Sequence, residues 1–367
     1  MVMRGESKMS SMVTRRGFVG GAALVGLALV GCGNTQVGAN ENDTSAADAT
    51  KAVYEMSREE EEEAIKKEPF YGKKLTVGYG GGLCLGAFGI TEDQGYSADE
   101  GLDCELMNVQ SKIDAVGSGQ VQVVGTHIAS LLVPAYNGIG MTFTLGIHSG
   151  CKSLYVLTDG SVRSTQDLKG QTIGVPEGMG SADQNIAMRF LGRDEVDPKT
   201  DVEWKQVAKE ACIQGMQNGE IAAAVLEDQY AMPFVSDGTI TYIRSLTYDD
   251  DFKVEPCCIL AFNSDFAKEN PVHVKRYTRA FQKAGVFIEQ NTEQALDILL
   301  KNSWASGDRD DDLALMQAFD YTITEQRTKD SLLDIIADYQ KYGIIDSEQS
   351  ADEVLAKVWA PVLDDVQ

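Results

Sequence analysis

Residues 167–181 read DLKGQTIGVPEGMGS, and this stretch decides the predicted fold. Its pattern predicts a short helical turn that stops at Gly170, then a buried strand over residues 172–175, then a glycine-rich turn. Ser181 follows the turn and carries a hydroxyl suited to capping the next helix. The free amides at the start of such a helix favour an anion or a carbonyl group. The stretch therefore predicts a strand–turn–helix unit.

Strands and helices alternate on both sides of this unit. Before it we expect strands at 75–79, 102–107, 121–124 and 141–145 with a helix at 128–136; after it, strands at 172–175, 202–207, 221–226 and 240–246 with helices at 182–191, 210–218 and 229–235. Alternation of this kind predicts parallel sheets covered on both faces by helices. Two series in roughly 300 residues exceed one hydrophobic core, so we predict an α/β fold with two lobes. Beyond residue 262 the apolar spacing is helical, notably over 272–287 and 331–342.

The complete string 167–181 resembles the entrance to the second lobe in the SsuA/THI5-like, or NMT1-like, family of substrate-binding proteins for nitrate, sulfonate and taurine. Residues 118–124 and 218–224 each resemble the family's helix–glycine–strand unit, which occurs once per lobe. The family usually has aspartate where this chain has Gln122 and Ala222, which indicates a divergent subfamily.

The resemblance implies a type II periplasmic-binding-protein-like fold. Each lobe is then a mostly parallel sheet flanked by helices, and a two-segment hinge joins the lobes around the solute. We expect the chain to cross between lobes near 153–158 and 257–262. The predicted divisions are a signal peptide at 1–31, a flexible acidic stalk at 32–70, lobe 1 at 71–155 and 260–367, and lobe 2 at 156–259.

Ligands of open α/β sheets bind at the carboxyl ends of the strands, and this rule selects the candidate ligand-binding residues. They are Gly81, Gly82, Leu83, Cys84, Thr126, His127, His148, Gly178, Gly180, Ser181, Glu227 and Asp228. Helix-terminal amides favour an anionic solute, whereas Glu227 and Asp228 favour a cation or a hydrogen-bonding ring. Thr126, Glu227 and Asp228 are explained equally well as helix-terminal residues. The charge of the solute stays open.

The beginning of the chain predicts export. Arg15 and Arg16 precede an apolar run over residues 18–30, which is too short to span a bilayer and has the flanks of a signal peptide. The run ends in Leu29-Val30-Gly31-Cys32, which resembles a bacterial lipobox. We therefore expect Cys32 to carry a lipid anchor on the outer face of the cytoplasmic membrane. The paired arginines fit a twin-arginine signal, but Sec signals contain them too.

The acidic charge of the chain excludes one class of partner. The net charge is −24, and removing residues 1–31 takes away four basic residues and one acidic residue, which leaves −27. Such a protein cannot neutralise phosphates, so we expect no nucleic-acid partner. Residues 33–50 are small and polar, as in a stalk, and residues 56–67 predict a short solvated helix.

These observations predict the solute-binding component of an ABC importer. It would capture a small polar organic or oxyanion solute and deliver it to the permease and ATPase subunits as a monomer. We expect no enzyme activity, cofactor or metal, because the chain has no G-x-S-x-G, no H-E-x-x-H and only three histidines. The alternatives are a sensory or adhesive lipoprotein without an importer and an enzyme related to thiamine-pyrimidine synthesis.

Four cysteines fall in segments assigned to the cleft or the hinge, together with His127 and His148. They are Cys84, Cys151, Cys257 and Cys258. Three interpretations stay open. The cysteines are small apolar residues of buried strands, or thiolate and imidazole ligands of a soft metal, or Cys151 forms a hinge disulfide with Cys257 or Cys258, of which Cys257 is slightly favoured. Alternation along a strand allows only one of Cys257 and Cys258 to form that bridge.

Overall fold

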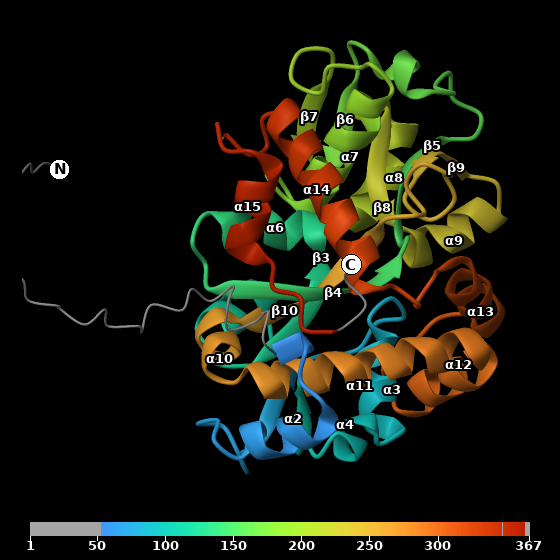
Figure 1. The fold of residues 1–367 in the computed structure, drawn as a ribbon. Coiled ribbons are helices and arrows are strands. Elements are labelled where there is room, and N and C mark those ends of the chain that lie inside the picture. The colour runs from blue at the N-terminus through green and yellow to red at the C-terminus, as the bar shows by residue number, and fades with distance from the viewer. Residues whose placement is uncertain (1–52, 347, 364–367) are drawn as a thin grey trace, which may run out of the picture. The chain divides into compact units, whose positions relative to one another are not determined.

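The computed structural model describes residues 53–346 and 348–363 and contains two five-stranded sheets (Figure 1). The first has the order β2-β1-β3-β10-β4, with β1 Leu75–Gly78, β2 Cys104–Met107, β3 Val123–His127, β4 Met141–Ser149 and β10 Pro256–Asn263. The second has the order β7-β6-β8-β5-β9, with β5 Lys152–Leu157, β6 Thr172–Val175, β7 Glu203–Gln206, β8 Ala223–Glu227 and β9 Ile240–Ser245. The predicted signal peptide and Cys32 lie outside the described residues.

Four strands of each sheet run in the same direction, and one runs against them. In the first sheet β1 pairs in parallel with β2 and β3, while β10 is antiparallel to both β3 and β4. In the second sheet β5 is the reversed strand, between β8 and β9. The reversed strands are those with which the chain enters a lobe from the other one. The predicted two-lobe α/β fold is confirmed, with one antiparallel strand inserted in each mostly parallel sheet.

The helices cover both faces of the sheets. They are α2 Arg58–Ile65, α3 Gly86–Asp93, α4 Tyr96–Asp99, α5 Lys112–Gly117, α6 Ile128–Tyr136, α7 Ala182–Arg193, α8 Lys209–Gln217, α9 Asp228–Ser236, α10 Ser264–Glu269, α11 Pro271–Gln290, α12 Thr292–Lys301, α13 Arg309–Ala318, α14 Glu325–Lys341 and α15 Ala351–Val358. A 3-10 turn spans Thr165–Leu168. Figure 1 shows α11 and α12 running along the lobe that contains the first sheet.

Strand β10 shows why the first sheet needs helices on both faces. All of its residues are buried, and successive side chains point to opposite faces. Leu260 and Phe262 pack in the core cluster that includes Phe281 of α11. Ile259 and Ala261 pack in the separate cluster formed with α6, α14 and α15. A strand buried on both faces lacks the polar alternation of a half-exposed strand, as the apolar run over 257–262 indicates.

The two crossings between the lobes lie outside the segments predicted for them. Residues 153–157 and 257–262 belong to β5 and β10, which are strands of different sheets. The chain instead crosses at Gly150 and Cys151 and again over residues 246–255. Gly150 and Cys151 have φ angles of 92° and 88°, a conformation that favours glycine. The prediction placed the crossings inside apolar runs of the sequence. These runs form strands β5 and β10, and the crossings lie just before them.

The segment predicted as a solvated helix is instead packed against the protein. Helix α2 contacts α11, and its Glu61 and Ile65 are buried. Glu100 is also buried, and its carboxylate accepts hydrogen bonds from Arg279, Lys283 and Arg58. Burial opposes ionisation of Glu100, but the hydrogen bonds from Arg279, Arg58 and Lys283 outweigh it and lower its pKa. An ion-pair network therefore holds α2 in place, and this part of the predicted stalk is folded.

Glu100→Gln is expected to destabilise the protein by about 1.5–3 kcal/mol at neutral pH, because three cations lose a charged acceptor. The lowered pKa means that this stabilisation is complete above the unfolded value of about 4.3 and is lost as the pH falls below it. Urea unfolding between about pH 5 and pH 3 should therefore show a steeper loss for the wild type than for the variant. Glu63→Gln, in an exposed pair with Lys66, should change little. Equal slopes for wild type and Glu100→Gln would contradict the assignment.

Candidate functional site

A cavity of about 260 Å³ lies between the two sheets, at the carboxyl ends of β1, β3, β4 and β8. Its lining comes from both lobes and from the C-terminal helices. The lining residues are Gly81, Gly82, Leu83, Cys84, Leu85, Lys112, Thr126, His127, Cys151, Glu177, Glu227, Gln229, Cys258, Leu315 and Phe319. This is the position that the strand-end rule selects for a ligand in an open α/β sheet.

The structure divides the residues selected from the sequence into two groups. Those that line the cavity are Gly81, Gly82, Leu83, Cys84, Thr126, His127 and Glu227. Those outside the lining are His148, Gly178, Gly180, Ser181 and Asp228. His148 nevertheless lies directly behind the lining, in a cluster with Cys84, Cys151 and Cys258. The role of each residue in binding stays a prediction.

The glycine loop after β1 carries Cys84 to the cavity. Gly81 and Gly82 have φ angles of 116° and 115°, which side chains rarely adopt. The amide of Gly82 donates to the carbonyl of Trp304 at 2.6 Å, and a Cβ at Gly81 would lie 2.7 Å from the same oxygen. The loop needs glycine for this close approach, which fixes it between β1 and the segment after α12.

The turn before α7 is held by side chains other than the one predicted. Ser181 is the N-cap residue of α7, but its hydroxyl makes no capping bond and is buried without a partner. Instead, Asp183 accepts the amide of Glu177 at 3.0 Å, and Gln184 accepts the amide of Gly180 at 2.6 Å. These bonds fix the turn so that Glu177 lines the cavity.

Glu227 and Asp228 are neighbours with different roles. Asp228 is fully buried and accepts hydrogen bonds from Tyr155, at 2.8 Å, and from Thr247. Burial raises the pKa of Asp228. Its carboxyl therefore braces the second crossing, and Asp228 is not among the residues that line the cavity. Glu227 lines the cavity; burial opposes its ionisation, but the nearby charge of Lys152 lowers its pKa.

Several lining residues were absent from the sequence prediction. Lys112 points to the cavity from the start of α5 and donates to the carbonyl of Gly125 at 2.9 Å. Burial lowers its pKa. Leu315 and Phe319 come from α13 and the residue after it, far along the chain from the strand ends. Lys112 and Glu177 had a usable signal, because each follows a predicted strand.

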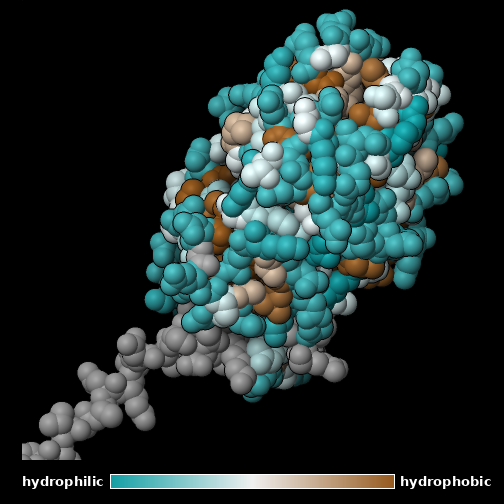
Figure 2. Space-filling model, turned by 90° about the horizontal axis from the view of Figure 1, so that it is seen from above, coloured by the Kyte–Doolittle hydropathy of each residue, from teal (hydrophilic) through white to brown (hydrophobic). Residues whose placement is uncertain are grey.

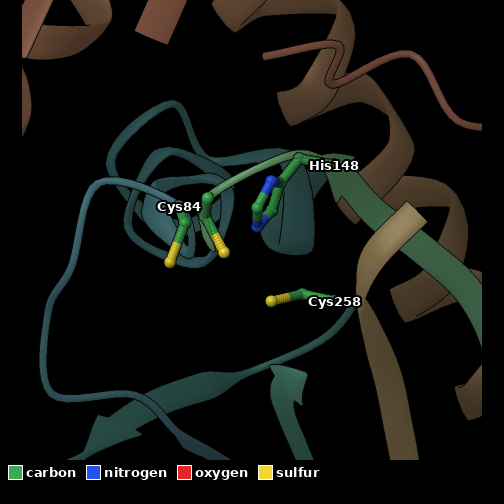
Figure 3. A group of neighbouring side chains, drawn as sticks. Cys84, His148 and Cys258 are labelled. Carbon is green, nitrogen blue, oxygen red and sulfur yellow. The ribbon is translucent and has the colours of Figure 1, made fainter. Parts of the chain in front are cut away.

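Thiols and imidazoles gather at one wall of the cavity. Figure 3 shows the side chains of Cys84, His148 and Cys258 converging from the loop after β1, from β4 and from β10. Cys151 and Cys257 are free thiols with their Sγ atoms 3.3 Å apart. The structure thus places the sulfurs of Cys151 and Cys257 close together without a covalent bond between them. The predicted disulfide between these two residues stays a prediction.

The thiols differ in acidity. Burial raises the pKa values of Cys151 and Cys257. Burial also opposes ionisation of Cys258, but hydrogen bonds from Cys151, Cys257 and Cys84 outweigh it and lower its pKa. Cys258 is therefore the thiol of this cluster most inclined to be a thiolate.

The sequence model of the family described as NMT1/THI5 like matches residues 87–295, more than half of the chain. The chain belongs to the NMT1/THI5-like family. The resemblance seen in the sequence is thereby confirmed. A Brucella abortus (strain 2308) protein that carries the general name of a binding protein is 27% identical over 218 residues, 58% of this chain. The match spans 66% of that relative, just under two thirds of its length.

Solved structures with the same fold include two solute-binding proteins. The aliphatic sulphonate-binding protein SsuA from Escherichia coli has a TM-score of 0.63 and 13% identity, over 80% of this chain and 94% of that one. The nitrate-binding protein NrtA from Synechocystis PCC 6803 has a TM-score of 0.63 and 12% identity, over 78% of this chain and 86% of that one. At these identities the likeness establishes the fold of this NMT1/THI5-like protein.

A buried ion pair supports the cavity from the second lobe. The ammonium of Lys152 is buried, 2.6 Å from Asp183 and 3.5 Å from Glu177. Asp183→Asn is expected to destabilise this NMT1/THI5-like protein by about 3–5 kcal/mol in denaturant unfolding, since the buried ammonium keeps no charged partner of comparable burial. Glu177→Gln, at a half-exposed carboxylate, should cost much less.

The double variant Lys152→Met/Asp183→Leu is the matched control for this pair. It removes both charges, so it should recover part of the stability that Asp183→Asn loses. A single variant no less stable than the double would show that the pair does not support the cavity wall.

Proposed function

We propose that this protein is the extracytoplasmic solute-binding component of an ABC importer. The observation that carries the proposal is the cavity between the two sheets, which both lobes line beside the two crossings. A solute in such a cavity contacts both lobes at once, so its binding energy favours lobe closure. Permease and ATPase subunits would then be the partners of the closed form.

The lining suits a small polar solute. Lys112 offers a cation from the first lobe, whereas Glu177 and Glu227 offer carboxylates from the second. The backbone at Gly81 and Gly82 and the hydroxyl of Thr126 add hydrogen-bonding groups. Opposite charges on opposite walls favour a solute that carries both a hydrogen-bond acceptor and a donor, which includes polar organic molecules as well as oxyanions.

The lobes already contact each other around the cavity. The amide of Gln229, in α9 of the second lobe, donates to Asp312 at 2.9 Å and to the carbonyl of Ser306 at 3.1 Å. Asn185 of α7 donates to the carbonyl of Ala129 in α6 at 3.0 Å. We infer hinge bending at Gly150 and Cys151 and over residues 246–255, with these contacts formed on closure.

Export and anchoring complete the proposal. The lipobox ending at Cys32 supports a lipid tether on the outer face of the cytoplasmic membrane. In the described part of the chain, every helix is too short or too polar to be a membrane span. Figure 2 shows a face on which hydrophilic side chains predominate and apolar ones occur in small groups, as expected of a domain held near the membrane by a tether. A sensory lipoprotein without an importer fits the same tether.

Solute binding is tested by thermal unfolding with sulfonates, nitrate, pyrimidines and amines. A true solute at a hundred times its dissociation constant should add about 2.7 kcal/mol to the free energy of unfolding. Gln229→Ala should reduce this gain because it removes two contacts between the lobes, whereas Gln214→Ala, whose amide contacts only Asn218 of the same region, should not. If every class fails to stabilise the wild type and turnover of a pyrimidine is found instead, the enzyme alternative replaces this proposal.

Cys32→Ala is expected to release the protein from the membrane, because only a thiol accepts the diacylglyceryl group. Fractionation of producing cells should place wild-type protein with membranes and the variant in the soluble extracytoplasmic fraction. Cys104→Ser, at a cysteine inside the folded domain, is the control and should leave the distribution unchanged. Wild-type protein that is soluble and retains residues 1–31 would refute the anchor.

A further inference from the structure

A cluster of thiol and imidazole side chains lies beside the cavity. Its six members are Cys84, His127, His148, Cys151, Cys257 and Cys258. They come from the glycine loop, the ends of β3 and β4, the first crossing and the start of β10. Within the described residues, Cys104 and Cys212 are the other cysteines, and neither belongs to such a group.

We propose that Cys84, Cys151, Cys258 and His148 bind a thiophilic d10 metal ion, Zn²⁺ or Cu⁺, at the wall of the cavity. The ligand atoms of these four residues all lie within 4.8 Å of one another. Zinc–sulfur bonds of about 2.3 Å in a tetrahedron place neighbouring sulfurs about 3.8 Å apart, so small side-chain shifts complete the geometry. Thiolate and imidazole are the ligands that these ions prefer.

His148 has the orientation of a metal ligand. It is fully buried, and its Nδ1 donates to the carbonyl of Ser149 at 2.8 Å. The other nitrogen, Nε2, is buried without a hydrogen-bond partner and belongs to the cluster around Cys84 and Cys258. A metal-bound histidine typically donates its second N–H to a backbone carbonyl in this way. Phe319 and Tyr321 pack against the ring and fix its plane.

An unpartnered buried nitrogen argues against simple burial of the cluster. Leaving a polar group buried without a hydrogen bond is unfavourable, and such groups call for an explanation. A metal ion beside Nε2 of His148 gives that nitrogen a partner and binds the surrounding sulfurs.

A second set of four, His127, Cys151, Cys257 and Cys258, is also compact but less suited to an entering ion. Nδ1 of His127 already lies 3.1 Å from the sulfur of Cys257. Three members of each set line the cavity, so the ring nitrogens distinguish the sets. Nε2 of His148 is buried without a hydrogen-bond partner, whereas Nδ1 of His127 already has one.

The backbone conformation of Cys151 also supports the proposed metal site. Its φ of 88° is one that a cysteine rarely adopts, and glycine or asparagine would be less strained there. The strained conformation is held by the bond from its amide to Thr247, at 2.8 Å, and by the amide of Asp228 donating to its carbonyl at 2.9 Å. A thiol kept at such a position fits a ligand role.

This inference rests on the proposed function for the cavity, and it names the ion as the solute or as part of it. Binding by three thiols and one imidazole releases the thiol protons to the solvent. The proposed metal site replaces the expectation from the sequence that the protein binds no metal. In this site Cys151 is a metal ligand and not the partner of Cys257 in a disulfide.

The test uses the full chain with Cys32→Ala, reduced and kept without oxygen, so that six cysteines remain. Zn²⁺ and Cu⁺ are each titrated against a chromogenic chelator, and Co²⁺ serves as a spectroscopic substitute for Zn²⁺. We expect one ion per chain and, with Co²⁺, the visible absorption of a tetrahedral thiolate site. Cys84→Ser and Cys258→Ser should weaken binding more than the roughly 10–100-fold typical of residues that only support a ligand.

Three further variants identify the ligand set and the ion. Cys257→Ser and the matched control Cys104→Ser should each leave affinity within about threefold, a change of roughly 0.65 kcal/mol. His148→Gln should abolish Zn²⁺ binding but weaken Cu⁺ binding less, because three thiolates suffice for Cu⁺. Circular dichroism of each metal-free variant checks that it is folded, and the metal-induced rise in Tm gives a readout independent of the chelator.

Three outcomes would overturn the inference: no ion binds the wild type more tightly than Cys84→Ser and Cys258→Ser; Cys257→Ser is as damaging as Cys258→Ser; or exported protein contains a Cys151–Cys257 disulfide in a non-reduced digest. If an organic solute stabilises the protein while both ions fail, the proposed solute-binding function stands and the metal site falls. If neither ions nor organic solutes bind, both fall.

Discussion

The hydrogen bonds around Cys151 are the constraint on which the two-lobe arrangement depends. The amide of Cys151 donates to Thr247, its carbonyl accepts from Asp228, and the carboxyl of Asp228 accepts from Thr247 and Tyr155. These few bonds join the first crossing, the second crossing and the start of α9. Because all of these groups are buried, each unmade bond would leave a desolvated polar atom, which costs more than the bond itself contributes. The two crossings are therefore held in register, although 96 residues separate Cys151 from Thr247 in the sequence.

This arrangement also explains why the cavity collects residues from so many parts of the chain. Strands that run toward the hinge end at the cavity, and the reversed strands β5 and β10 begin there. The ends of β1, β3, β6 and β8, the first crossing and the start of β10 thus contribute side chains to one small volume. Cys258 lies at the start of β10 and His148 near the end of β4, and the antiparallel pairing of these strands places them opposite each other.

Much of this fold could be predicted from the sequence because its signals are local. The string 167–181 contains a strand, a turn and a helix start in sequence order, and the structure forms all three. The predicted cap at Ser181 failed because its hydroxyl makes no hydrogen bond. Asp183 and Gln184 instead accept the amides of Glu177 and Gly180, in the turn that precedes the helix. Helix α2 was misjudged for a different reason: its acidic residues look solvated until Arg279 and Lys275 of α11, more than 200 residues away, are placed beside Glu61.

The residues of the candidate site also divide into those with a local sequence signal and those without one. Strand-end residues such as Cys84, Thr126 and Glu227 were found by rule, since parallel strands end at one edge of a sheet. Leu315 and Phe319 carry no such mark. Asp228 was predicted to bind the solute together with Glu227, but only Glu227 lines the cavity, because the carboxyl of Asp228 accepts from Tyr155. At the start of a helix, neighbouring side chains point in different directions. The apolar spacing of the sequence does not predict which of two neighbours points into the cavity.

The contacts between the lobes differ in strength, and this difference locates the opening of the cavity. On one side Arg189 of α7 is buried between Glu255, at 2.7 Å and 3.0 Å, and Asp338 of α14, at 3.0 Å. On the other side Gln229 makes neutral-amide bonds to Asp312 and Ser306 at the cavity itself. Breaking a buried ion pair costs about 3–5 kcal/mol, whereas a hydrogen bond to a charged acceptor contributes about 1.5–3 kcal/mol. We therefore expect the proposed bending to have the Arg189 side as its pivot and the Gln229 side as its mouth, where a solute or a metal ion would reach Cys84 from the solvent.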